Sequence, residues 1–298
     1  MRKMSLILAI AAVFVVVAFV ACDKDNDGQT GRVVLSITDA PIDTDGITGV
    51  FITFTEIQYH ISGNNWASFP DFEGPRTFNL LDLTRGETDL LGDLELEAGK
   101  YTQLRFILDA PSYGQEPPSN PGCYLEFENG ETQPLFVPSG AQTGYKAVGT
   151  FEVPANGTVE VTADFDVRRS VVKAGASGKY ILKPTIRLVV NDQSGTIKGN
   201  VFNIPDNTQI VVYAYESGTY DEAETAEPAP EETRFPNAVS SDRVCENDMY
   251  HIAFLAPMDY DLIVVANVDD EFSEVLMVIE DVTVESQKIT ELDIVLPE

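Results

Sequence analysis

Residues 158–167, which read Thr-Val-Glu-Val-Thr-Ala-Asp-Phe-Asp-Val, have the clearest secondary-structure pattern in the sequence. Apolar side chains occupy every second position from 159 to 167, and threonine or carboxylate side chains occupy the positions between them. Because successive side chains of a β-strand point to opposite faces, this alternation predicts a strand with one face on a hydrophobic core and the other in water.

The same alternation appears earlier in the chain, where glycine, proline and asparagine turns separate its repeats. Only residues 84–94 have the spacing of a helix, and Gly86 and Gly92 keep that helix short. The sequence lacks the long helical crossovers that join parallel strands in α/β sheets. We therefore predict an all-β fold built as an antiparallel β-sandwich. Further strands are expected at residues 33–37, 50–59 and 104–108.

A polar turn cluster at residues 191–195, Asn-Asp-Gln-Ser-Gly, divides the chain into two candidate domains. We predict two tandem antiparallel β-sandwich domains, one over residues 31–190 and the other over residues 195–298. The strands expected in the second domain are residues 196–202, 209–216, 249–255, 261–268, 274–284 and 288–296.

Residues 220–236 interrupt the second domain with a stretch rich in glutamate, proline and alanine. Such a stretch buries too little apolar surface to offset the entropy of ordering it, so we predict a mobile acidic loop. From Gln193 to the C-terminus, 23 acidic residues face 4 basic ones, a net charge of −19. Most of the negative charge of the protein is therefore expected on the second domain.

The N-terminus has the layout of a secretory signal peptide. Arg2 and Lys3 precede an apolar run over residues 6–20, and the run ends at Ala21 and Cys22. A small residue followed by cysteine at this place resembles the lipobox of bacterial lipoproteins. An uncleaved N-terminal helix is the alternative interpretation.

The lipobox resemblance implies cleavage before Cys22, a diacylglycerol on its sulfur and acylation of the new amino terminus by a chain such as palmitate. Residues 1–21 would then be a signal peptide, and residues 22–30 an acidic lipid-anchored tether. Each buried methylene of the acyl chains contributes about 0.8 kcal/mol, so several chains would hold the protein on a membrane.

Charge excludes some partners. Without Arg2 and Lys3, 17 of the 19 basic residues remain against 48 acidic ones, a net charge of −31. A nucleic-acid binder needs a basic face, which this composition does not offer. No polybasic patch for anionic lipids is present, so the lipid on Cys22 is the expected membrane anchor. We expect the protein on the outer membrane or cell surface, facing an extracytoplasmic space.

Six phrases in the first half resemble a bacterial family of exported lipoproteins, the domain of unknown function 4382 (DUF4382). The resemblance covers roughly residues 31–190 and implies a β fold and an exported location, but no activity. The phrases are LSITDAP at 35–41, FNLLDL at 78–83, LLGD at 90–93 with AGKYTQLR at 98–105, VPSG at 137–140, DFD at 164–166 with SVV at 170–172, and LKPTIR at 182–187.

The second domain is similar to carboxypeptidase-regulatory or transthyretin-like β-sandwiches. The phrases that carry this resemblance are GTIKGNV at residues 195–201 and FLAPMDYDL at residues 254–262. Domains of this type are usually non-catalytic spacers or adhesion modules, so the resemblance implies such a role here.

Asp164 and Asp166 are the candidate metal ligands. They lie two positions apart on the strand predicted at residues 158–167, so their carboxylates share one face. Carboxylate oxygens are ligands for Ca²⁺, and Asp39 lies on another strand. The alternative is that these are solvated carboxylates that pair with Arg168 and Arg169. No organic cofactor is expected, and weak calcium binding is the open question.

Other side chains leave two interpretations open. Cys123 and Cys245 are either isolated thiols or a disulfide, which their spacing does not decide. The aromatic side chains of Trp66, Tyr59 and Tyr113 either stack on a sugar ring or pack within the fold.

Catalytic motifs are missing from the sequence: it holds no Gly-x-Ser-x-Gly elbow and no glycine-rich phosphate loop. We therefore predict that the protein is not an enzyme but a non-catalytic binding or adhesion module, with a protein or glycan as possible ligand. The alternatives are a carboxylate-dependent hydrolase of envelope or glycan substrates and a structural envelope protein.

Overall fold

Residues 158–166 form strand β11, Thr158–Asp166, in the computed structural model of the chain. The structure describes residues 28–40, 46–61, 66–70, 72–138, 144–230, 232–245, 247–269 and 271–297. Cys22 and the predicted signal peptide, residues 1–21, lie outside these residues, as does most of the tether at 22–30.

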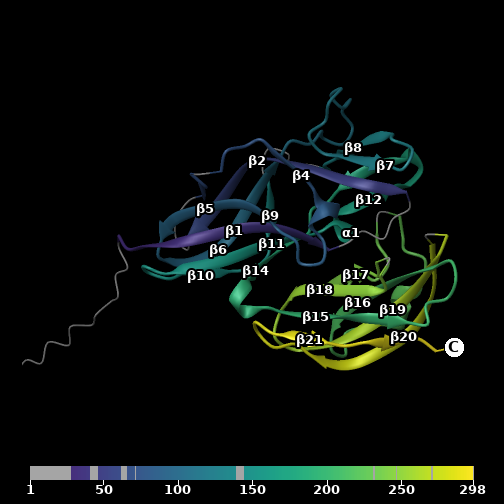
Figure 1. The fold of residues 1–298 in the computed structure, drawn as a ribbon. Helices are drawn as coiled ribbons and strands as arrows, with labels where there is room; N and C mark the ends of the chain where they lie inside the picture. The colour runs from purple at the N-terminus through teal and green to yellow at the C-terminus, as the bar shows by residue number, and fades with distance from the viewer. Residues whose placement is uncertain are drawn as a thin grey trace, which may run out of the picture.

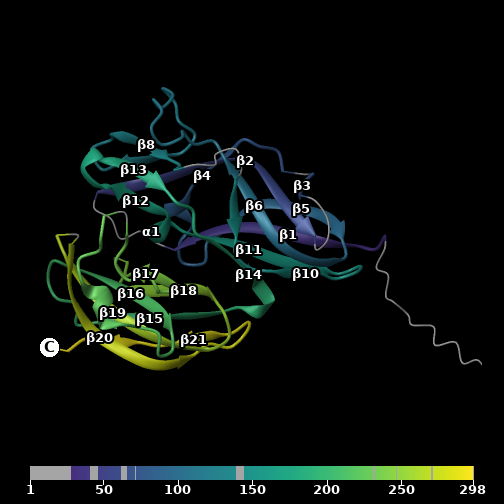
Figure 2. The ribbon, with the colours of Figure 1, turned by 180° about the vertical axis from the view of Figure 1, so that it is seen from behind.

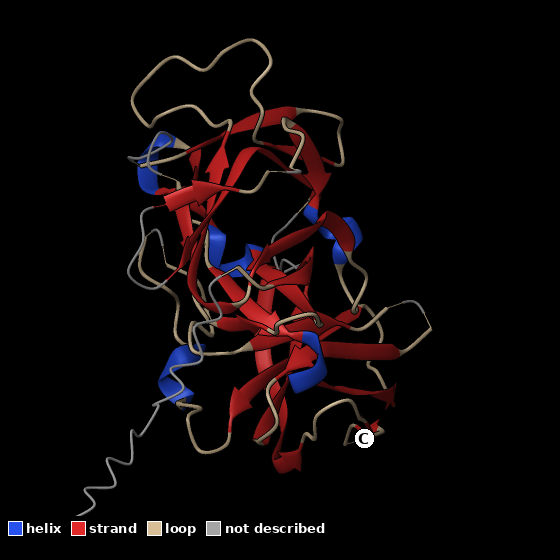
Figure 3. Ribbon diagram, turned by 90° about the vertical axis from the view of Figure 1, so that its left-hand side faces the viewer, coloured by secondary structure: helices blue, strands red, loops and turns tan. Residues whose placement is uncertain are grey.

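The all-β prediction is confirmed. Among the described residues α-helix is limited to α1, Val167–Ser170, and the remaining helical pieces are short 3₁₀ turns (Figure 3). No described helix has the length and apolar character that crossing a membrane requires. These short turns are η1 Leu80–Leu83, η2 Gly175–Ser177, η3 Asn191–Gln193 and η4 Glu222–Thr225.

The first unit, residues 28–190, contains two sheets. The smaller sheet has the order β14-β11-β1-β5. Within it β1 pairs with β11 in parallel, from Arg32↔Thr158 to Ala40↔Asp166, which differs from the predicted antiparallel arrangement. Parallel pairing needs a long connection, and most of the first unit lies between these two strands. The strands are β1 Thr30–Ala40, β5 Asp89–Glu97, β11 and β14 Ile186–Val190.

The larger sheet of the first unit has ten strands, with the main order β10-β6-β2-β7-β8-β13-β12. Its centre is the long strand β2, which also pairs with β3 and β4, while β9 pairs with β6. The strands are β2 Ile47–Ile61, β3 Trp66–Ser68, β4 Arg76–Asn79, β6 Gly99–Leu108, β7 Tyr124–Phe127, β8 Thr132–Phe136, β9 Tyr145–Ala147, β10 Phe151–Val153, β12 Val171–Ala174 and β13 Lys179–Leu182.

The core of the first unit lies between these sheets. Phe54 of β2 is fully buried, and its ring centroid lies 5.2 Å from that of Phe106 and 6.4 Å from that of Phe165 on β11. Burying a phenylalanine side chain contributes about 1.5–3 kcal/mol. The apolar face predicted for residues 158–167 therefore does face a core, as its alternation requires.

The second unit, residues 195–297, contains two four-stranded sheets (Figure 1). One has the order β18-β15-β21, with β22 also on β15, and the other has the order β17-β16-β19-β20. Buried side chains such as Ile197, Val212 and Leu262 come from both sheets and form one cluster. The strands are β15 Gly195–Phe202, β16 Thr208–Glu216, β17 Ser240–Arg243, β18 Met249–Leu255, β19 Asp259–Val268, β20 Glu271–Thr283, β21 Ile289–Glu291 and β22 Ile294–Val295.

One expectation from the sequence is wrong. Residues 84–94 do not form a helix, because from Asp89 onward they belong to strand β5. Residues 220–236, expected to bury too little apolar surface to become ordered, include Phe235, whose side chain is 1% exposed against Tyr213 and Phe272. The mobility of this acidic segment stays a prediction.

The candidate site at the joint between the two units

The face of β11 predicted to be wet is buried from Thr162 onward. Asp164 is 4% exposed and Asp166 is 7% exposed, so the prediction of solvated carboxylates is wrong. The reason is that the second unit packs against this end of the smaller sheet: β17 contacts β1 and lies next to α1 in both views (Figures 1 and 2). We call this surface the joint; its polar residues are Asp39, Arg85, Asp164, Asp166, Arg168 and Arg187 of the first unit, and Ser241, Asp242 and His251 of the second.

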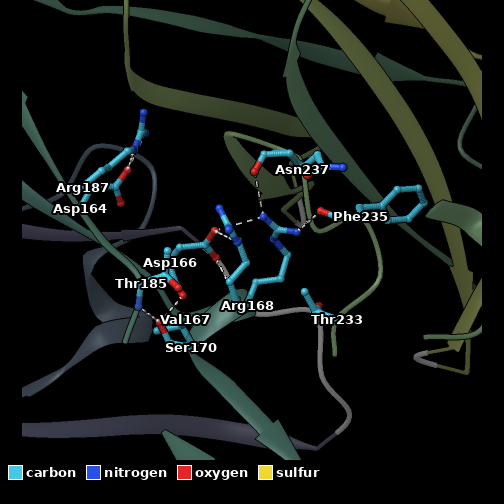
Figure 4. Close-up of polar contacts among 12 residues, drawn as sticks. Asp164, Asp166, Val167, Arg168, Ser170, Thr185, Arg187, Thr233, Phe235 and Asn237 are labelled. Atoms are coloured by element: carbon cyan, nitrogen blue, oxygen red, sulfur yellow. Dashed lines mark hydrogen bonds and ion pairs between the residues drawn. The ribbon is translucent and has the colours of Figure 1, made fainter. Parts of the chain in front are cut away.

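Asp164 pairs with Arg187 on the neighbouring strand β14 (Figure 4). The guanidinium Nε and Nη2 lie 2.6 and 2.5 Å from Asp164 Oδ2. Burial raises the pKa of Asp164, and Arg187 opposes that rise. The pair therefore holds a carboxylate that would be costly to bury alone.

Asp166 ends β11 and begins the next element. Its Oδ1 accepts a hydrogen bond from the backbone N–H of Arg169, which caps helix α1. Its Oδ2 lies 3.1 Å from Nη2 of Arg168, whose side chain is 2% exposed. The sequence suggested this pairing, but not that it would be buried.

Arg168 crosses from the first unit to the second (Figure 4). Its guanidinium donates to the backbone carbonyls of Phe235 at 2.5 Å, Ala238 at 3.2 Å and Arg234 at 3.4 Å. These residues lie 66 to 70 positions further along the chain. Arg168 is therefore a fixed connection between the units and not a surface charge.

Asp39 lies close to Asp164 and Asp166 and lines a small cavity at the joint. Its Oδ1 accepts from the backbone N–H of Val167 at 3.0 Å, while its buried Oδ2 has no hydrogen-bond partner among the described residues. Burial, reinforced by Asp164 and Asp166, raises the pKa of Asp39 well above its ordinary value. The cavity holds about 10 Å³, which is room for one water molecule.

A second polar contact closes the joint. Arg85 donates to Asp242 Oδ2 at 3.4 Å and to the carbonyl of Arg243 at 2.9 Å. Burial raises the pKa of Asp242 to about 6, although the His251 backbone N–H donates to its Oδ2 at 2.7 Å. The neighbouring Gly86 has φ +82°, a backbone conformation that favours glycine. A Cβ at this position would also lie 3.3 Å from Ala253 and His251 of the second unit, so glycine allows the close contact there.

Asp164 and Asp166, the candidate metal ligands, both face arginines in the structure. The described residues contain no group of three or more histidine, cysteine, aspartate or glutamate side chains placed to hold a metal ion. Calcium binding therefore stays a prediction that melting experiments can test.

We expect the melting temperature to rise equally in calcium, magnesium and sodium salts of matched ionic strength, because salt screens the net negative charge. A calcium-only rise would contradict this. A site with a dissociation constant of about 0.1 mM would add about 1.4 kcal/mol at 1 mM calcium, or about 3–6 °C. Loss of such a rise in Asp164→Asn with Asp166→Asn would place the ion there.

Surface hollows larger than the cavity beside Asp39 are found elsewhere on the protein. One of them holds about 420 Å³, and Glu152 and Asp192 are among the residues that line it. Both side chains are exposed. The general acid of a glycoside hydrolase, by contrast, is a carboxyl group that stays protonated because it is buried in apolar surroundings. The joint has such buried carboxyls, but its cavity is too small for a sugar ring.

The three aromatic candidates lie apart from the joint. The ring of Trp66 is covered by the guanidinium of Arg105, 3.8 Å from its centroid. Tyr59 packs on Tyr101 and Phe69. Tyr113 is 42% exposed. These contacts favour packing over sugar stacking for Trp66 and Tyr59.

The two described thiols are free. Cys123 is buried in the first unit, and Cys245 is partly exposed in the second. The disulfide that the sequence left open is thus not formed in this structure.

Comparison with known families decides the identity of the first unit. The profile described as "Domain of unknown function (DUF4382)" matches residues 30–184, slightly more than half of the chain. The chain belongs to this family. The DUF4382 match includes β1, β11 and α1, and it ends before β14 and the second unit.

No curated protein matches the chain. Solved structures with some likeness include the shaft pilin SpaA from Lactobacillus rhamnosus GG, with 13% identity, a TM-score of 0.22, and coverage of 90% of this chain and 97% of that chain. Another is GBS52, the minor pilin of Streptococcus agalactiae, with 11% identity, a TM-score of 0.21, and coverage of 88% and 94%.

A third is the Bacillus anthracis TIE protein, with 12% identity, a TM-score of 0.21, and coverage of 90% of this chain. The DUF4382 protein spans 34% of the length of that chain, and 26% of a leucine-rich repeat protein from Bacteroides thetaiotaomicron. Because TM-scores near 0.2 describe little shared geometry, these likenesses carry no inference about function.

Proposed function

We propose that this DUF4382 protein is a lipid-anchored, non-catalytic binding or adhesion module on an extracytoplasmic face of the cell envelope. The observation that carries the proposal is that buried carboxyl groups at the joint form ion pairs with arginines and line a cavity too small for a sugar ring. Asp164 and Asp166 pair with arginines, and the cavity beside Asp39 has room for one water molecule. The carboxyl groups best placed for acid–base chemistry are therefore held in structural ion pairs, and Asp166 also orients Arg168, which contacts the second unit.

The second unit acts in this proposal as a spacer of the carboxypeptidase-regulatory or transthyretin-like type. Two facing four-stranded sheets around one apolar cluster support that role. The contacts of Arg168 with three backbone carbonyls fix its orientation on the first unit. A rigid two-unit body holds a binding surface at a set distance and angle from its membrane anchor.

Membrane anchoring is tested by metabolic labelling with palmitate. We expect label in the wild-type protein and none in Cys22→Ala, because the lipid is attached through the Cys22 sulfur. Cys245→Ser, which removes a partly exposed thiol of the second unit, is the matched control and should be labelled like wild type. Equal labelling of wild type and Cys22→Ala would contradict the anchor.

Binding is tested with the full chain in detergent against envelope extracts and glycan arrays. Capture of one defined protein or glycan, unaffected by Glu152→Gln and Asp192→Asn, would support the binding module. Turnover of a glycan that either variant abolishes would instead favour the hydrolase. Absence of any ligand would favour the structural envelope protein.

A further inference from the structure

A surface hollow of the second unit collects three soft metal donors. The hollow holds about 520 Å³ and is lined by Cys245, Met249 and His251, together with Arg85, Asn247 and Tyr250. Met249 is 39% exposed, and Cys245 and His251 are partly exposed, so all three are open to solvent. This hollow borders the joint through Arg85 and His251 but does not include Asp164 or Asp166, and the proposed function does not use it.

The backbone holds these donors close together. The N–H of Cys245 donates to the carbonyl of Met249 at 3.1 Å, and the N–H of Asp248 donates to the carbonyl of Cys245 at 2.9 Å. These two bonds close a tight turn, so the side chains of Cys245 and Met249 leave adjacent pieces of chain. His251 follows Met249 by two residues on β18 and therefore shares its face.

Asn247 connects the two sulfur atoms. Its Oδ1 accepts a hydrogen bond from Cys245 Sγ, and its Nδ2 donates to Met249 Sδ at 3.3 Å. One amide group thus contacts both sulfurs, which fixes them on the same side of the turn. A site whose ligands are held before binding loses less conformational entropy when the ion arrives.

The imidazole of His251 is suited to metal binding. It lines the same hollow as Cys245 and Met249 and is partly exposed, so an ion from solvent can reach it. An imidazole ring ligates a metal through a nitrogen lone pair. Neutral imidazole is the form of histidine that ligates metals.

We propose that Cys245, Met249 and His251 form a binding site for Cu(I). Thiolate and thioether sulfur are soft ligands that select Cu(I), and imidazole suits copper as well. Ca²⁺ and Mg²⁺ require oxygen ligands, which the three donors do not supply. Binding replaces the thiol proton of Cys245 by the metal ion, so each Cu(I) bound releases one proton and no electron is transferred.

The test is an anaerobic titration of Cu(I) in competition with bathocuproine disulfonate. It uses the full chain in detergent with Cys22→Ala, so that Cys123 and Cys245 are the remaining thiols. We expect one Cu(I) per chain. The affinity for Cu(I) should fall at least about tenfold in Cys245→Ser, Met249→Leu and His251→Gln, because the loss of even an outer-shell partner of a metal ligand typically lowers metal affinity about tenfold or more. Melting curves of each variant confirm that it is folded.

The matched control is Cys123→Ser. Cys123 is fully buried, and burial raises the pKa of its thiol to about 12, so it neither meets nor ligates the ion. Wild-type affinity in Met249→Leu and His251→Gln would overturn the proposal, because a lone thiol would then explain the binding. Loss of binding in Cys123→Ser would overturn it too.

A second readout needs no substitution at the site. Cu(I) should slow alkylation of Cys245 by iodoacetamide in the same protein, while Cys123 stays unreactive with or without the ion. Alkylation of Cys245 at an unchanged rate with saturating Cu(I) would also overturn the proposal.

Discussion

Replacing Arg168 with methionine is expected to lower the free energy of unfolding by about 3–5 kcal/mol, the cost of breaking a buried ion pair by removing one partner. The methionine fills a similar volume but leaves Asp166 without its partner at 3.1 Å. It also leaves the carbonyls of Phe235 and Ala238 without their donor across the joint. Denaturant unfolding followed by circular dichroism measures the change.

Arg169→Ala is the matched control for Arg168→Met. Arg169 is the next residue of α1, and its Nε lies 3.9 Å from the same carboxylate, but its side chain is 40% exposed. Exposed pairs contribute about 0–1 kcal/mol, and the capping N–H of Arg169 survives the substitution. Equal effects of the two substitutions would show that Arg168 does not connect the units.

The second large effect concerns pH and Asp242. In the folded protein burial raises the pKa of Asp242 to about 6, compared with 3.8 for an ordinary aspartate. Between these values the folded state holds a proton that the unfolded state has lost, so stability falls as pH rises. The contribution is fully present below pH 3.8 and lost above pH 6, a change of about 3 kcal/mol.

Asp242→Asn isolates this contribution. The variant should gain about 3 kcal/mol of unfolding free energy relative to wild type between pH 4 and pH 7. The lowered pKa of His251 makes its own contribution to stability rise with pH below pH 6.5. His251 is present in both proteins, so this contribution cancels when the two are compared. Asp93→Asn is the sign control: Arg32 lowers the pKa of Asp93, so its contribution grows with pH. A pH-independent difference for Asp242→Asn would contradict the prediction.

The sequence predicted a strand at residues 158–167, of which residues 158–166 form β11, because apolar alternation is a local signal. It did not predict that the opposite face would be buried, because the covering residues come from elsewhere in the chain. Arg168 reaches carbonyls of residues 234–238, and no local pattern marks a backbone carbonyl as a partner.

Local patterns also misled at two places. Leu90, Leu91 and Leu94 have helical spacing, yet they lie in β5, since pairing with β1 outweighs a weak helical preference. Strand β17, Ser-Ser-Asp-Arg, has no apolar alternation at all, and yet it supplies the buried Asp242. A polar strand that is buried between two units can be recognised as buried only when the surface of the unit that covers it is known.

The place of β1 in its sheet has a mechanical consequence. This strand begins at Thr30, shortly after the N-terminal segment, and lies between β11 and β5, with nine residue pairs to the first and eight to the second. A pull on the N-terminal end acts along the strand and loads both ladders in shear. Their hydrogen bonds resist together, whereas a strand peeled from an edge would lose them one by one. A force applied to the N-terminal end would therefore be resisted by both ladders at once, at the place where the chain enters the fold.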